Sequence, residues 1–156
     1  MQMQKYKRKA AICRSDGLKL DVNFFLRQFA EEHSGRELII DILNSKATFI
    51  PLEDIREDTV FFLNKRRVMF MELYDRDLTE ETMLVPETEV HLELANGQIL
   101  NGSLFVEMPQ ERSRVSDYLN FPPGFIYLGR KEGDLILNKE FMFSAKEKDE
   151  GAPHQT

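Results

Sequence analysis

The chain of 156 residues contains 27 acidic and 21 basic residues, and its net charge of −6 argues against non-specific nucleic-acid binding, which requires Lys and Arg to neutralise phosphates. With 42% hydrophobic residues, no apolar run long enough to span a bilayer and no secretory signal, the composition indicates a folded cytoplasmic protein without membrane contact. A single cysteine, Cys13, excludes an internal disulfide, and three scattered histidines are too few for a metal site.

The first half of the chain is predicted to consist of short strands. Asp16-Gly17 between two strand-like runs indicates a hairpin, because glycine accepts a positive φ. A strand follows to about Phe25, whereas residues 26–44 fit either a helical or an extended conformation. Another strand is expected at 48–52.

Residues 59–63 and 68–73 are interpreted as a hairpin closed at Asn64-Lys65. Asparagine tolerates the left-handed conformation that such turns need, so we expect Asn64 to adopt it. Residues 75–87 are acidic and carry a proline near their end, which predicts a linker.

The second half opens with alternating apolar and polar residues at 90–94, and Asn96-Gly97 predicts a hairpin with a returning strand at 99–106. Further strands are expected after a proline turn, at 125–128, 135–137 and 141–144. The charged end of the chain, 148–156, is expected to be disordered.

The two halves share residues at nearly constant spacing, which predicts a tandem duplication. At a spacing of 76 residues the matches are Arg36/Arg112, Asp41/Asp117, Leu43/Leu119, Asn44/Asn120, Phe49/Phe125, Ile50/Ile126 and Leu52/Leu128. At a spacing of 74 they are Leu63/Leu137, Asn64/Asn138 and Lys65/Lys139, and at a spacing of 80 they are Gly17/Gly97, Leu20/Leu100 and Phe25/Phe105.

These patterns predict a mainly β fold built from two tandem SH3-like or Sm-like β units of about five strands each, with short helical turns. The first unit is expected at 5–74 and the second at 88–147, joined by the acidic linker at 75–87. Packing the two units against each other would bury more core than either unit buries alone.

Repeated polar residues are the candidate ligand- or partner-binding residues. The repeated ones are Arg36, Asp41, Asn44, Arg112, Asp117 and Asn120, and Arg114, which has no counterpart in the first half, is added because it lies just before Asp117. Each aspartate could instead cap the turn behind it, and each arginine could pair with the aspartate of its own unit. A nucleophile paired with a base is missing in both units, so no residue is predicted to be catalytic.

The second unit resembles a family of uncharacterised bacterial domains that carry R-x-S-D-x-L-N, then an F-I-x-L strand and a closing N-K hairpin. Here these motifs stand as RVSDYLN, FIYL and LILNK, and the likeness covers roughly residues 90–143. The first unit departs from it, with Ile40 where the second has Ser116. The resemblance supports the fold prediction and implies no activity.

Three functional hypotheses follow, and none requires a cofactor. The first is a non-catalytic protein-interaction or regulatory module that binds a protein partner or self-associates. The second is an Sm-like RNA-binding module, which the net charge disfavours. The third is a small-ligand-binding protein or enzyme that uses Asp41 and Asp117 in a cleft between the units, which the missing nucleophile disfavours.

Overall fold

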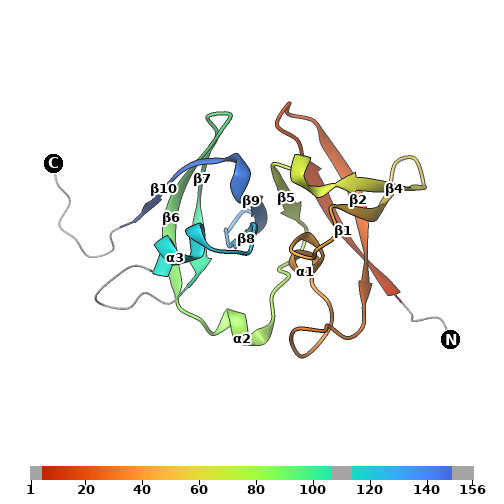
Figure 1. Cartoon of the computed structure of the whole chain (residues 1–156), viewed down its shortest axis with the longest axis horizontal. Coiled ribbons are helices and arrows are strands. Elements are labelled where there is room, and N and C mark those ends of the chain that lie inside the picture. The colour runs from red at the N-terminus through yellow and green to blue at the C-terminus, as the bar shows by residue number, and fades with distance from the viewer. Residues whose placement is uncertain (1–4, 107–113, 149–156) are drawn as a thin grey trace.

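The computed structural model describes residues 5–106 and 114–148, which fold mainly into β-strands (Figure 1). The strands of the first half are β1 (Lys5–Cys13), β2 (Lys19–Arg27), β3 (Phe49–Asp54), β4 (Thr59–Asn64) and β5 (Phe70–Leu73). Those of the second half are β6 (Glu87–Leu94), β7 (Ile99–Phe105), β8 (Phe125–Leu128), β9 (Leu135–Asn138) and β10 (Met142–Glu147). The short helices are α1 (Ile39–Leu43), α2 (Glu80–Met83), α3 (Arg114–Asn120), and the single 3-10 turns η1 (Lys65–Arg67) and η2 (Lys139–Phe141).

The two predicted hairpins at glycine are present. Gly17 has a φ of 90° and Gly97 a φ of 89°, a region that L side chains rarely adopt. The residue before each glycine holds the turn, because the side-chain oxygens of Asp16 and Asn96 both accept from the backbone N–H two residues on. Local chemistry therefore sets both turns.

The strands form two antiparallel sheets. The larger sheet has seven strands in the order β4-β3-β2-β1-β5-β9-β8, and the smaller has three in the order β10-β6-β7. Ser103 and Gly129 exchange two backbone hydrogen bonds of 2.9 Å, which join β7 to the chain just after β8. The mainly β class is confirmed, but the described strands form open sheets and no closed barrel.

Both halves have the same order of elements and the same strand registers. Ile12 faces Leu20 in the β1–β2 pair, and Leu92 faces Leu100 at the matching place in the β6–β7 pair. Three further pairs of facing residues in the first half match a pair in the second half. Cys13–Phe70 (β1–β5) matches Glu93–Ser144 (β6–β10), and Phe49–Asn64 (β3–β4) matches Phe125–Asn138 (β8–β9). Asn23–Glu53 (β2–β3) matches the bridge Ser103–Gly129. Equivalent positions of the two halves can therefore be compared directly.

Strand β5 lies between β1 of its own half and β9 of the other half, and each half places side chains in the core of the other. Met69 and Phe70 pack in the second-half core, while Tyr127 and Ile136 pack in the first-half core. The predicted hairpin of 59–63 with 68–73 is therefore wrong. Strand β4 pairs with β3 alone, because η1 turns the chain away before β5 begins.

The expected left-handed conformation of Asn64 is also wrong. Asn64 is extended, with a φ of −77°, and its side-chain oxygen accepts from the N–H of Arg66 to cap η1. Asn138 caps η2 in the same way by accepting from Glu140. Asparagine recurs here because its side chain replaces a backbone acceptor at the start of the turn.

The segment that the sequence left ambiguous, 26–44, and its equivalent in the second half both contain a helix. Within 26–44, β2 continues to Arg27 and α1 follows, while the equivalent segment of the second half forms α3. The predicted linker contains α2 and the fully buried Asp77. No helix in the described ranges is long and apolar enough to cross a membrane.

Candidate functional site

The contact between the two halves is built on β5 and β9, and we call it the seam. Met71 faces Ile136 at its centre. On either side, the N–H of Asn138 donates to the Met69 carbonyl at 3.1 Å and the N–H of Leu73 donates to the Asp134 carbonyl at 3.0 Å. Since hydrogen-bonded pairs alternate along antiparallel strands, Met71 and Ile136 form the hydrogen-bonded pair between them.

Two of the repeated asparagines hold the seam together. Asn44, at the end of α1, donates to the Phe125 carbonyl at 3.1 Å and accepts from the Phe125 N–H at 2.9 Å. Asn138 is buried, and its side-chain nitrogen donates to the carbonyl of Val68 at 2.9 Å. Both side chains bind main-chain groups of the opposite half, so their role here is to fix the halves against each other.

The repeated lysines close the ends of α1 and α3. The ammonium group of Lys65 donates to the Ser45 carbonyl, and that of Lys139 donates to the carbonyls of Tyr118 at 2.9 Å and Phe121 at 2.7 Å. Burial lowers the pKa of both lysines from the ordinary value. These cations satisfy carbonyls that a helix end leaves open, a role that sequence reasoning did not find.

Asn138→Ala is expected to destabilise the protein more than Asn64→Ala, by about 1–2 kcal/mol. Both changes remove a cap, but only Asn138→Ala also removes the side-chain donor to the buried Val68 carbonyl of the opposite half. Urea unfolding of both variants measures the difference. Equal midpoints would show that the side chain of Asn138 adds nothing to the seam.

Arg36 does not pair with the aspartate of its own repeat. It binds the buried Asp77, which also accepts from the Ile39 N–H at 2.7 Å. Asp41 accepts from the Leu38 N–H at 2.8 Å and lies 2.6 Å from His33, so it caps the start of α1 as the alternative interpretation expected. Hydrogen bonds to the Ser34 carbonyl and to Asp41 raise the pKa of His33, which favours the charged imidazole.

The remaining candidate residues lie on or near α3. Asn120 donates to the Ser116 carbonyl at 2.8 Å within the helix, and Asp117 lies one turn before its end. Arg114 is the first residue of α3, and Arg112 lies outside the described residues. Figure 1 shows α1, which carries Asp41, and α3, which carries Asp117, apart from each other, with β8 and β9 between them.

A buried network joins the segment before α2 to both halves. The Tyr127 hydroxyl donates to Asp134 at 2.6 Å and accepts from the Asp77 N–H at 2.9 Å. Asp134 also accepts from Arg76 at 2.9 Å and from the Arg130 N–H at 3.0 Å. Burial raises the pKa of Tyr127 far above its usual range, so the phenol stays protonated. Every member has partners, which is the pattern of a structural network.

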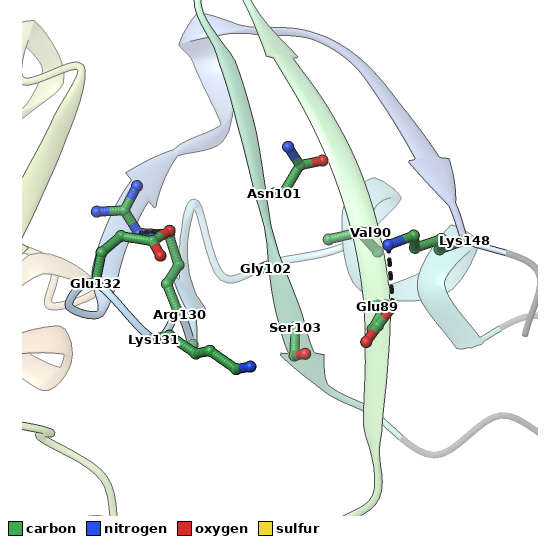
Figure 2. Close-up of a pocket in the computed structure, with 10 residues that line it drawn as sticks. Glu89, Val90, Asn101, Gly102, Ser103, Arg130, Lys131, Glu132 and Lys148 are labelled. Carbon is green, nitrogen blue, oxygen red and sulfur yellow. Dashed lines mark ion pairs between the residues drawn. The ribbon is translucent and has the colours of Figure 1, made fainter.

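A shallow pocket of about 350 Å³ lies between β7 and the turn after β8 (Figure 2). Its charged side chains are of both signs, and four of them form two ion pairs. Glu89 lies 3.6 Å from Lys148, and Arg130 lies 3.6 Å from Glu132. Lys131 is the fifth charged lining residue. Because these charges largely offset each other, the pocket does not favour an anion such as a phosphate.

No protein-family model, curated protein or solved structure matches this chain.

The outer edge of β4 combines an end-of-sheet position with exposed apolar side chains. This strand ends the seven-stranded sheet, and its sequence TVFFLN holds no charged residue and no proline. Val60 and Phe62, two positions apart, are both exposed, and Phe49 of β3 is exposed beside them. An edge strand without charge, proline or cover presents unpaired backbone groups beside apolar side chains, which is a template for strand pairing.

Proposed function

We propose that the chain is a non-catalytic interaction module that binds an extended polypeptide along the edge of β4. The carrying observation is the exposure of Val60 and Phe62 on an uncovered edge strand. A strand added there would gain main-chain hydrogen bonds along β4, and the two apolar side chains would select alternate residues of the ligand.

The chemistry of the rest of the described chain supports a non-catalytic role. The buried carboxylates of Asp77 and Asp134 are held by arginines and backbone N–H groups. Cys13 is buried, and burial raises the pKa of its thiol to about 12, which removes the nucleophilic thiolate. Among the described residues no cluster of His, Cys, Asp or Glu is arranged to hold a metal ion.

We also infer that the two halves arose by tandem duplication of one small β unit. The matching registers and the repeated Asn and Lys residues at the seam support this history. The likeness of the second half to uncharacterised bacterial domains is part of the same proposal.

Selection of displayed random peptides on the immobilised protein tests the function. We expect peptides with alternating apolar residues, and Phe62→Lys should weaken their binding about tenfold or more, because it places a charge on the docking edge. Leu84→Lys is the matched control, since Leu84 is an exposed apolar residue at the end of α2, outside the strands of both sheets. Failure of a chain that is monomeric in solution to select any peptide, or equal loss of peptide binding in both variants, would contradict the proposal.

A further inference from the structure

The two strands that form the seam, β5 and β9, each have an equivalent strand in the other half, and these two equivalent strands do not pair with each other inside the chain. Strand β9 is the second-half equivalent of β4, and β10 is the equivalent of β5. Inside the chain, β5 pairs with β9. The equivalents β4 and β10 each end a sheet, and Figure 1 shows them at opposite ends of the long axis.

Side chains at equivalent positions of the two halves differ in solvent exposure, as expected if β4 lacks the partner strand that β9 has. Ile136 of β9 is fully buried by the seam, whereas its equivalent Phe62 is 69% exposed. Phe125 is 5% exposed and its equivalent Phe49 is 57% exposed. The first half thus presents, uncovered, the surface that the second half buries against β5.

The opposite edge shows the same difference. Met69, just before β5, is 3% exposed, whereas its equivalent Phe143 in β10 is 74% exposed. In the seam, Asn138 lies between Phe125 and Met69. A second copy docked in the same way would place Asn64 between Phe49 of its own chain and Phe143 of the other chain.

The hydrogen-bonding groups needed for this contact are in place. Asn64 caps η1 with its oxygen, as Asn138 caps η2, but its amide nitrogen donates to no described residue, whereas that of Asn138 donates across the seam. The N–H of Lys148 donates to the Glu89 carbonyl on the β6 side. Because hydrogen-bonded and non-hydrogen-bonded residue pairs alternate along β10 and β6, the N–H of Ala145 points away from β6, to the side on which no other described strand pairs with β10.

We propose that the partner of β4 is β10 of a second copy of this chain, paired in the register of the seam. Transferring the seam register places Ser144 opposite Leu63, Ala145 opposite Phe62 and Lys146 opposite Phe61. The Asn44 contact with Phe125 transfers to Asn120 of one copy and Phe49 of the other. This inference rests on the proposed function and identifies its ligand.

Such a contact is head-to-tail, since it joins two different surfaces. A pair of copies joined in this way keeps one free β4 edge on one copy and one free β10 edge on the other. Association continues until a ring closes, or proceeds as an open filament if the rotation between copies does not close.

The test is the mass of the full chain and of two edge variants in solution, measured by light scattering after size exclusion. The 18.3 kDa chain is expected to form assemblies that grow with concentration or reach one closed size. Phe62→Lys blocks β4. Ala145→Pro blocks β10, because proline removes the outward N–H and is tolerated on an edge strand. Each variant alone is expected to be monomeric, with a dissociation constant raised about tenfold or more.

Mixing the two variants gives the sharpest result. Phe62→Lys keeps a working β10 and Ala145→Pro keeps a working β4, so the mixture should form one-to-one dimers that cannot grow. A wild-type monomer at every concentration overturns the inference, as does a mixture that stays monomeric while both variants retain a cooperative melt. Val60→Lys and Phe143→Lys replace any variant that fails to fold.

The peptide selection separates the two proposals. If the wild-type chain is monomeric but β4 still binds selected peptides, the second copy is the wrong partner and the interaction module stands. If neither peptides nor a second copy bind at β4, the interaction module itself is wrong.

Discussion

Replacing Asp77 with alanine is expected to lower the free energy of unfolding by about 3 kcal/mol, because breaking a buried ion pair leaves the other charge uncompensated. Asp77 is completely buried and accepts from Arg36 and from the Ile39 N–H, with Arg8 at 3.4 Å. Alanine removes all three interactions and leaves the N–H at the start of α1 without an acceptor.

Asp77→Asn separates the contribution of the ion pairs from that of the hydrogen bond to the Ile39 N–H. The amide oxygen can still accept from the Ile39 N–H, so this variant should lose the ion pairs alone and fall between wild type and Asp77→Ala. Asp75→Ala is the matched control, because Asp75 is exposed two residues earlier in the same segment. Urea unfolding measures all three variants, and Asp77→Ala within about 0.5 kcal/mol of the control would show that the network is dispensable.

The same network ties one residue of the predicted linker, the buried Asp77, to both halves. Asp77 binds the first half through its carboxylate, while its N–H binds Tyr127 of the second half. The sequence could not show this, since the ion pair joins residues 36 and 77, and acidic residues followed by a proline are typical of a solvated linker. We therefore expect both halves to unfold in one transition, with Asp77 at their junction.

The parts of the fold that local chemistry decides were predictable. Asp16-Gly17 and Asn96-Gly97 form the expected hairpins, and alternation at 90–94 places Val90, Leu92 and Leu94 inward. Pairing between strands far apart in sequence was not predictable. Phe70 and Met71 indicate a buried strand, but the residues do not state that β9 is the neighbour on one side and β1 on the other.

In the candidate site, too, the sequence indicated local features but not contacts between residues far apart in the chain. The repeat identified Asn44 and Asn138 as special positions, and both bind the main chain of the opposite half. Their role was not readable, because a polar residue repeated in two halves is equally expected for a turn, a ligand or an interface. The signal that could have pointed to an interface is the uncharged run TVFFLN, whose two faces are both apolar.

Gly102→Ala is expected to destabilise the protein by about 1–3 kcal/mol, because a methyl group there overpacks the junction between the two sheets. A Cβ on Gly102 would lie 2.6 Å from the Gly129 carbonyl oxygen and 2.7 Å from a Leu128 side-chain carbon. The backbone oxygen cannot move aside freely, since Gly129 exchanges two hydrogen bonds with Ser103. Glycine inside a strand marks such a close approach of two backbones.

Gly124→Ala is the control, because no atom beyond its chain neighbours lies within 4 Å of a Cβ at that position. Its unfolding midpoint should stay near that of wild type, while Gly102→Ala should also speed hydrogen exchange at the amides of Ser103 and Gly129. Those two amides carry the bridge between β7 and the end of β8, so their exchange reports the junction directly. If both alanine variants unfold at the same urea concentration, the three-stranded sheet shifts away from the seven-stranded sheet without cost, and the bridge contributes nothing to the fold.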